Sequence, residues 1–386
     1  MPRGEILVAG SLAQRPGYGG HAWVFLQYLL GFRRLDWNVT FVDRLEPGMC
    51  VDHRGAPCPL ERSANLAYLV AVMREFGLQD DVALLYDRGR DVIGLPLDQL
   101  LDRARRSALL LNVMGYLDDE AVLGAASRRV LLDIDPGFGQ MWQALGLHQL
   151  FRDHDDYVTI GQNISRPNCA VPDCGIGWIT TRPPVVLDQW PARPGGDKGF
   201  TSVATWRGPF APVIYQGVTY GLRVHEQRRF ADLPRRTGQR FELALDIDEA
   251  DASDLELLRS GGWSLVPPPT VAGTPSAYRG YIQSSTAEFL VAKQMYVRAR
   301  TGWVSDRSAC YLSTGRPVVA QDTGLAEIIP TGEGLLTYTT AEEAAAAVDE
   351  VCGDYGRHAR AARSLAEDWF DSDKVLGRLL AELRIG

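Results

Sequence analysis

The residues best suited to bind an anion lie between positions 293 and 307. This segment is polar and carries four cationic side chains: Lys293, Arg298, Arg300 and Arg307. Ser305 is a favourable helix N-cap and Asp306 follows in the first turn, which predicts a helix that ends at Gly315. Because the free amides of a helix N-terminus and nearby cations attract negative charge, we expect the segment to bind a phosphate group. Lys293 and Arg307 are the two cations expected to reach it.

Polar residues that could move a proton or hold a second ligand follow predicted strands in the first half. His21 lies where a glycine-bearing loop meets a helix, and is either a general base or a polar residue at a helix start. Asp135 stands just past a strand, before Pro-Gly, and is either a functional carboxylate or a turn residue. Gly19 and Gly20 would let a ligand approach the first strand closely, and Tyr116 caps the end of another strand.

The first half shows a repeated strand–helix pattern. The predicted strands are residues 5–10, 39–43, 82–86, 108–113, 129–134 and 157–161. The predicted helices are residues 22–35, 64–76 and 97–106. Such alternation is typical of a doubly wound parallel sheet, whose strands carry ligands at their carboxyl ends. The loop at residues 14–21 lacks the GxGxxG pattern, so it does not predict a dinucleotide site.

A Pro- and Gly-rich stretch at residues 181–196 reads as a linker to a second sheet. The strands predicted after it are residues 200–205, 241–246, 263–266, 288–292, 317–320 and 334–338. We therefore predict an α/β protein with two Rossmann-like, doubly wound domains that face a cleft. The domains are residues 1–190 and 197–365. Residues 366–386 either return as a helix to the first domain or form an ordinary terminal helix.

Composition restricts the partners. The net charge of −8 opposes binding to nucleic acid. The sequence has no run of about 18 apolar residues and no recognisable signal peptide, so we expect a cytoplasmic protein without a membrane span. Six cysteines are sparse for this length and are expected to be reduced thiols. Cys169 and Cys174 lack two further ligands at zinc spacing, so no metal and no resident cofactor are expected.

One local pattern resembles a known family. The run from Gly315-Arg-Pro-Val-Val-Ala to Gly324-Leu-Ala-Glu-Ile-Ile, followed by Gly332-Glu-Gly-Leu-Leu, looks like the donor-site segment of family-4-type GT-B glycosyltransferases. The resemblance implies that the second domain binds a nucleotide sugar and the first an acceptor. Two glutamates of the family motif are missing, because Gly302 and Cys310 occupy their positions. Asp306 could bind a ribose hydroxyl in their place, or could only stabilise the helix N-terminus.

From their chemistry and their positions after predicted strands, we expect these residues to bind the donor: Trp206, Arg207, Lys293, Ser305, Asp306, Arg307, Asp322, Thr323, Gly324 and Glu327. Backbone amides of residues 322–324 would approach the sugar or phosphate. Glu327 could accept sugar hydroxyls or be an ordinary first-turn glutamate, and Trp206 could stack on a base or belong to the core. Positive charge at the diphosphate would stabilise the negative charge that grows as its bond to the sugar breaks.

The function expected from these features is transfer of a sugar from a nucleotide-diphosphate donor to a hydroxyl of a small molecule, in specialised metabolism. An inverting reaction would need His21 or Asp135 as base, whereas a retaining one could need neither. The protein would be a monomer or a homodimer. Alternatives are a nucleotide-sugar epimerase or phosphorylase on the same fold, and a non-catalytic binding protein that has kept it.

Overall fold

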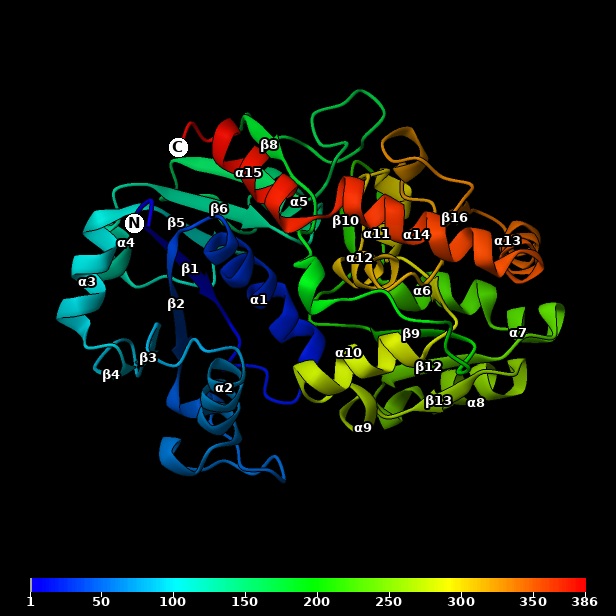
Figure 1. Cartoon of the computed structure of the whole chain (residues 1–386), viewed down its shortest axis with the longest axis horizontal. Coiled ribbons are helices and arrows are strands. Elements are labelled where there is room, and N and C mark those ends of the chain that lie inside the picture. Colours follow the sequence, from blue (N-terminus) through cyan, green and yellow to red (C-terminus); the bar gives the residue numbers. More distant parts are fainter. Residues whose placement is uncertain (1) are drawn as a thin grey trace.

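Two separate parallel β-sheets form the framework of the molecule, one from each half of the chain (Figure 1). The computed structural model describes residues 2–386. The first sheet has eight strands in the order β4-β3-β2-β1-β5-β6-β7-β8, and among its described strand pairs only β3–β4 is antiparallel. Its strands are β1 Glu5–Gly10, β2 Asn38–Leu45, β3 Val82–Tyr86, β4 Asp91–Gly94, β5 Ser107–Val113, β6 Arg129–Asp133, β7 Asp156–Thr159 and β8 Trp178–Thr180.

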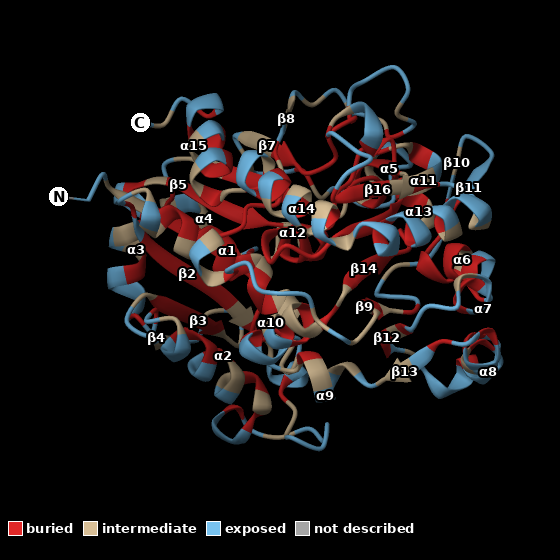
Figure 2. Ribbon diagram, turned by 45° about the vertical axis from the view of Figure 1, so that its right-hand side comes forward, coloured by how far each residue is buried: buried red, intermediate tan, exposed pale blue. Residues whose placement is uncertain are grey.

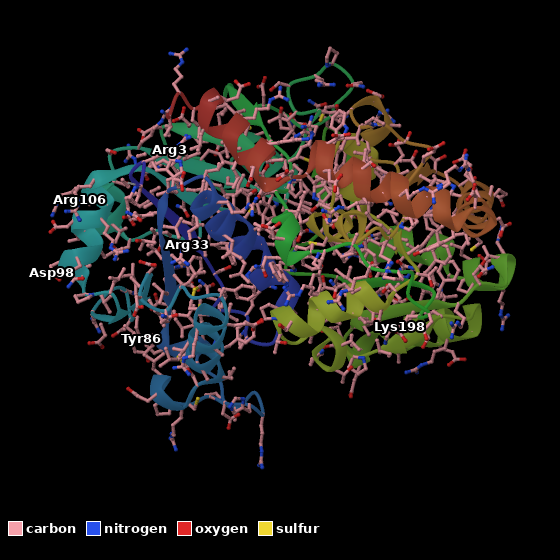
Figure 3. The ribbon with its side chains drawn as sticks, in the orientation of Figure 1. Arg3, Arg33, Tyr86, Asp98, Arg106 and Lys198 are labelled. Atoms are coloured by element: carbon pink, nitrogen blue, oxygen red, sulfur yellow. The ribbon has the colours of Figure 1, made fainter. Side chains whose placement is uncertain are left out.

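Helices cover both faces of this first sheet, and the central strands are therefore apolar on both sides. These helices are α1 Gly19–Arg34, α2 Ala64–Glu75, α3 Leu97–Arg106, α4 Glu120–Ala125 and α5 Phe138–Ala144. Helix α3 has the predicted bounds and is amphipathic: Leu100 and Ala104 are buried, whereas Asp98 and Arg106 point outward at the edge of the molecule (Figure 3). Figure 2 shows the same division, with buried strands inside and exposed helix surfaces outside.

The second sheet has six parallel strands in the order β13-β12-β9-β14-β15-β16. They are β9 Phe200–Thr205, β12 Phe241–Asp246, β13 Ser264–Val266, β14 Ala287–Leu290, β15 Val318–Gln321 and β16 Leu335–Tyr338. A separate hairpin pairs β10 Val213–Tyr215 with β11 Val218–Tyr220. The helices are α6 Arg223–Gln227, α7 Leu233–Thr237, α8 Ala252–Gly261, α9 Pro268–Ala272, α10 Pro275–Ser284, α11 Gln294–Ala299, α12 Asp306–Ser313, α13 Ala341–Gly353 and α14 Tyr355–Trp369.

The last helix, α15 Ser372–Glu382, returns to the first half and packs against α1 (Figure 1). Leu376 of α15 is fully buried and lies over Gly31 of α1, where a β-carbon would come within 2.5 Å of Leu376 Cδ1. The crossing is tied at its start by two backbone hydrogen bonds to Val185 in the linker, from Val185 N to Phe370 O (2.7 Å) and from Ser372 N to Val185 O (2.9 Å). Residues 366–369 belong instead to α14.

The sequence missed elements that are short or irregular. Residues 294–299 form helix α11 within the polar segment 293–307, where no helix was predicted before Ser305, and strand β8 was not predicted before the linker. β4 and the β10–β11 hairpin were also missed. Strands of three or four residues carry too little periodicity to be recognised, and the neighbouring strand determines their pairing. Helix α1 begins at Gly19, three residues before the predicted start.

The packing of α15 on α1 can be tested with Leu376→Ala. Removing a fully buried leucine side chain leaves a cavity, so the free energy of unfolding should fall by about 2–5 kcal/mol. Leu147→Ala is the control, because Leu147 is 69% exposed and its truncation should change stability little. Urea unfolding followed by circular dichroism measures both, and equal effects of the two substitutions would contradict the packing.

Candidate functional site

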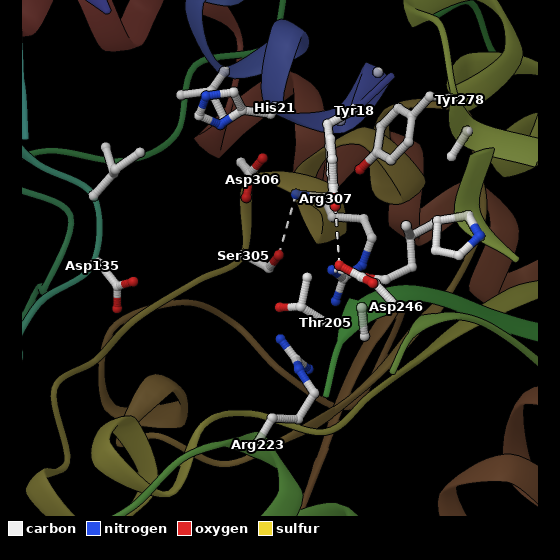
Figure 4. Close-up of a pocket in the computed structure, with 18 of the residues that line it drawn as sticks. Tyr18, His21, Asp135, Thr205, Arg223, Asp246, Tyr278, Ser305, Asp306 and Arg307 are labelled. Atoms are coloured by element: carbon white, nitrogen blue, oxygen red, sulfur yellow. Dashed lines mark hydrogen bonds between the residues drawn. The ribbon is translucent and has the colours of Figure 1, made fainter. Parts of the chain in front are cut away.

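A cavity of about 290 Å³ lies between the two halves, where strand ends from both sheets meet (Figure 4). The first half contributes the loop before α1 and the residues that follow β6. The second half contributes the ends of β9 and β12, the start of α6, and the segment from Lys293 to Arg307. The predicted residues that line it are Gly19, Gly20, His21, Asp135, Lys293, Ser305, Asp306 and Arg307.

Arg307 is held at the cavity wall by neighbours in its own half. The Ser305 hydroxyl caps α12 by accepting a hydrogen bond from the Arg307 backbone N–H (3.2 Å). The Arg307 side chain donates from Nε to Glu288 Oε1 (2.6 Å) and from Nη1 to the Val203 carbonyl (2.6 Å). Within residues 2–386, its buried Nη2 has no hydrogen-bond partner. Burial acts to lower the pKa of Arg307, but the Glu288 carboxylate outweighs it, and the pKa is raised.

Arg223, which sequence reasoning missed, faces the same space. It is buried, and its Nη1 donates to the Val291 carbonyl. Figure 4 shows the Arg223 and Arg307 side chains pointing into the cavity toward Thr205. No carboxylate oxygen of the described chain lies within 4.0 Å of the Arg223 guanidinium. Burial and the charge of Arg307 lower its pKa to about 10, so it stays cationic at neutral pH. Arg307 is thus ion-paired with Glu288, whereas Arg223 beside it has no carboxylate partner, and this unpaired cation favours an anionic ligand.

Lys293 takes part in an ion pair that crosses from one half to the other. Its Nζ lies 2.5 Å from Asp135 Oδ2, and the Tyr296 hydroxyl donates to the other oxygen of the same carboxylate. The ammonium also lies 5.2–5.3 Å from the ring centroids of Phe138, Phe210 and Tyr296. Burial lowers the pKa of Lys293, and Asp135 opposes that effect. The predicted phosphate cation and the predicted proton acceptor therefore contact each other.

His21 is neutral in this environment. Its Nε2 lies 3.1 Å from the Ser11 hydroxyl and 3.2 Å from the Ser11 carbonyl, and its ring packs edge-on against Phe25. Burial lowers the pKa of His21 to about 4, with a smaller effect from Arg15. In the second half of the chain, burial raises the pKa of the Asp306 carboxyl.

Gly19 and Gly20 allow the two halves to approach each other. A β-carbon on Gly19 would lie 2.2 Å from the Thr274 carbonyl oxygen, and one on Gly20 would lie 2.8 Å from the Tyr278 ring. The expectation that these glycines admit a ligand is therefore incomplete, because close contact with the second half already requires them. Near them, the Tyr18 hydroxyl donates to Asp246 Oδ2 across the cleft (3.1 Å).

The predicted donor residues after β15 lie outside this cavity in the described structure. Asp322 accepts hydrogen bonds from the Gly324 and Leu325 amides and so forms a turn. Thr323 donates its hydroxyl hydrogen to the Trp303 carbonyl, and Gly324 packs against Asn163. Glu327, in the short helical turn Leu325–Glu327, pairs with Arg300 and accepts from Asn168. Asn163 and Asn168 belong to the first half of the chain, so their contacts with Gly324 and Glu327 join the two halves outside the cavity.

Three other predicted residues are also placed elsewhere in residues 2–386. Trp206 is buried, and its indole N–H donates to Asp254 (2.9 Å). Arg207 pairs with Asp251 on the surface, and Tyr116 packs against the core at the end of β5. Asp254 binds Trp206 and Asp251 binds Arg207, so both side chains of the loop after β9 are held away from the cavity. The sequence does not reveal these pairs, because more than forty residues separate the partners.

Several lining residues were not singled out from the sequence: Thr205, Arg223, Asp246, Tyr278 and Tyr296. Thr205 and Asp246 are the last residues of β9 and β12, so the rule that ligands bind at carboxyl ends of strands could have found them. No sequence pattern marks Arg223 as a ligand-binding residue, because only the tertiary structure shows that it has no acidic partner.

Two features are absent from the described residues: a metal-binding cluster and a helix that could span a membrane. Residues 2–386 contain no group of three or more His, Cys, Asp or Glu side chains placed to hold a metal ion. Over the same residues, no helix combines the length and apolarity that crossing a bilayer requires. The expectation that the reaction needs no metal stays a prediction.

Comparison with known proteins identifies the fold. No protein-family model matches the sequence, and no curated protein matches it either. An alpha-glucosyltransferase solved with UDP and mismatched DNA is similar over 100% of both chains, with a TM-score of 0.58 and 11% identity. HepE from Anabaena, solved with UDP-glucose, covers 99% of both chains at a TM-score of 0.57 and 14% identity. A glycosyltransferase from Rickettsia africae covers 98% of this chain and 97% of its own, at a TM-score of 0.54 and 10% identity.

The chain therefore has the GT-B fold of these glycosyltransferases: two Rossmann-like α/β halves that face each other across a cleft. The fold class expected from the sequence is confirmed. Identities of 10–14% show the fold and leave the activity to be argued from the site.

The buried state of His21 predicts a pH dependence of stability. Since its pKa falls from 6.5 to about 4 on folding, the unfolded chain binds a proton that the folded protein does not. Stability should therefore be lost as the pH falls from about 6.5 towards 4, by at most about 1.4 kcal/mol per pH unit. His21→Gln should remove this part of the slope in urea unfolding at pH 7.5, 6.5, 5.5 and 4.5. A constant difference between the two proteins across that range would contradict the assignment.

Proposed function

We propose that this protein is a glycosyltransferase that binds a nucleotide-diphosphate sugar in the cavity between its two halves. The observation that carries the proposal is the pair Arg223 and Arg307, two cavity-facing guanidinium groups of which only Arg307 has a carboxylate partner, Glu288. The fold supports it, because structures with this fold were solved with UDP or UDP-glucose. A diphosphate would give the Arg223 guanidinium the anionic partner that it does not have among the described residues.

The arrangement suits the chemistry of sugar transfer. When the bond between the sugar and the diphosphate breaks, negative charge grows on the leaving phosphate oxygen. Fixed cations in a site shielded from water stabilise that charge without reorganising. Arg223 and Arg307 take this role, aided by the amides at the start of α12. Asp306, at the same helix start, is proposed to bind a ribose hydroxyl in place of the two glutamates of family-4-type enzymes.

The rest of the cavity divides between donor and acceptor. Pro268, Ala272 and Tyr278 offer largely apolar surface to a nucleobase, and lie on the side of the second sheet. Asp135 and His21, from the first half, lie where a hydroxyl would approach. The pKa of about 4 makes His21 a weak proton acceptor at neutral pH, which favours Asp135 as the general base of an inverting reaction.

We propose a small-molecule acceptor of specialised metabolism, and a monomeric or homodimeric cytoplasmic enzyme that uses no metal. The net charge of −8 supports a small molecule over nucleic acid. One similar glucosyltransferase was solved with DNA, so a DNA acceptor is the alternative to test. Mobility-shift assays at low salt, with and without nucleotide sugar, address it directly.

Arg223→Gln should weaken binding of a nucleoside diphosphate by about tenfold or more, because a charge-assisted hydrogen bond contributes roughly 1.5–3 kcal/mol. Arg298→Gln is the matched control: it removes one positive charge from the segment around α11, but Arg298 is exposed and donates to the Thr219 carbonyl outside the cavity. Calorimetric titration with UDP, GDP and dTDP measures the effect and identifies the base. Failure of all three to bind the wild-type protein would overturn the proposal.

Turnover separates the proposed activity from its alternatives. Incubation with a panel of nucleotide sugars should consume donor only when an acceptor is present. Donor conversion without acceptor would indicate an epimerase, donor cleavage that depends on phosphate would indicate a phosphorylase, and tight binding with no product under any condition would indicate a non-catalytic protein.

Asp135→Asn should lower kcat by about 10²-fold or more while nucleotide affinity changes little, because the amide cannot accept the acceptor's proton. Tyr296→Phe is the control, since it removes one hydrogen bond to Asp135 but keeps the carboxylate and its ion pair with Lys293. Initial rates and the anomeric configuration of the product are the measurements. A retained anomer together with near-normal activity of Asp135→Asn would contradict the base assignment.

A further inference from the structure

A second cavity, of about 360 Å³, lies at the junction of the two halves near the C-terminal helix. It is bounded by the end of β8, the loop after β7, the short turn Leu325–Glu327 and helix α15, which lie at the top of Figure 1. Among the described residues, the two cavities have no lining residue in common. Glu327, expected in the donor site, lines this second cavity instead.

Arg182, just after β8, has an incompletely satisfied side chain at this cavity. Its guanidinium lies 4.4 Å from the centroid of the Trp369 ring, on which it stacks. Its Nε is buried, and within residues 2–386 it has no hydrogen-bond partner. No carboxylate oxygen of the described chain lies within 4.0 Å of this guanidinium. A half-buried cation in this state is costly unless a ligand or ion neutralises it.

Two more guanidinium groups line the same space. Arg378 comes from α15, and Arg166 from the loop after β7. Burial and the charge of Arg378 both lower the pKa of Arg182. Like Arg182, neither has a carboxylate oxygen within 4.0 Å in the part of the chain described. Three arginines from three separate segments therefore border one cavity without a fixed counter-charge.

The carboxylates at the rim do not cancel this charge. Glu327 is engaged by Arg300 and Asn168, and Asp368 pairs with Lys374 at 3.4 Å. Glu382, on α15, is the remaining carboxylate that lines the cavity in residues 2–386. One unpaired carboxylate faces three unpaired guanidinium groups, so an anion is attracted overall.

We propose that this cavity binds a small phosphorylated molecule, whose phosphoryl oxygens accept hydrogen bonds from Arg182 and Arg378. The planar fork of arginine matches phosphoryl oxygens in pairs, and Thr180 and Gln162 add polar groups beside it. The volume admits a ligand larger than inorganic phosphate alone. Since the arginines come from the linker side, from α15 and from the β7 loop, the ligand would hold the C-terminal helix at the junction of the two halves.

The test uses pyrophosphate as probe and the full-length protein at low ionic strength. Because the first cavity is also expected to take pyrophosphate, the titrations are done in the Arg223→Gln background. That protein should still bind one equivalent by calorimetry. Adding Arg182→Gln or Arg378→Gln should weaken this binding by about tenfold or more. Adding Arg360→Gln, an exposed arginine of α14 outside the cavity, should leave it unchanged. Equal affinity in all these proteins, or no binding in the Arg223→Gln background, would overturn the proposal.

Further titrations test whether the second cavity prefers phosphoryl groups and whether it binds independently of the first cavity. Glu382→Gln should tighten pyrophosphate binding, because it removes the unpaired rim carboxylate. Citrate at the same charge should bind more weakly than pyrophosphate; equal or tighter binding of citrate would overturn the phosphoryl class. Arg378→Gln should leave nucleoside diphosphate affinity at the first cavity unchanged, so failure of one site is distinguishable from failure of the other. Since Arg378 is exposed on its helix, its variant should also keep the wild-type unfolding temperature, whereas Arg182→Gln loses the stacking on Trp369.

Discussion

The shortage of negative charge around Arg223 and Arg307 is the constraint on which the proposed site depends. Glu288 is fully buried on β14 and binds Arg307 and the Ser308 hydroxyl, so it fixes one guanidinium and has little capacity left for the second. Arg223 is left with a carbonyl partner only. Burying the Arg223 cation without a carboxylate partner is unfavourable. The same arrangement favours a dianionic ligand, because its negative charge would pair with the Arg223 guanidinium.

Contacts between the halves keep this pair shielded from bulk water. The Asp135–Lys293 ion pair bridges the cleft on one side of the cavity, and the Tyr18–Asp246 hydrogen bond bridges it elsewhere. Gly19 and Gly20 bring α1 against the second half, and α15 returns to cover α1. The chain therefore closes around the cavity at several points that are far apart in sequence. A shielded site strengthens each electrostatic interaction inside it.

The two arginine-rich cavities differ in how they were built. In the first, Arg223 and Arg307 stand in the first turns of α6 and α12, beside the carboxyl ends of β9 and β12, and strand ends of this kind are where α/β sheets bind ligands. In the second, they come from a linker, a loop and the terminal helix, segments that no repeated motif defines. In both cavities the lining includes an arginine that has no carboxylate partner, and such an arginine attracts an anionic ligand.

Local sequence determined the elements and part of the site. Apolar runs and helix caps depend on residues only a few positions apart, and examples of such caps are Ser305 before α12 and Thr340 with Glu343 at α13. The sequence therefore predicted most strands and helices, and their alternation predicted the fold class. Tertiary structure alone decided which cations stay without a counter-charge. Arg300 is paired with Glu327 and Lys293 with Asp135, whereas Arg223 has no carboxylate partner among the described residues. Such pairing depends on distances of a few ångströms between side chains that the sequence separates by tens to more than a hundred positions, and no periodic pattern encodes it.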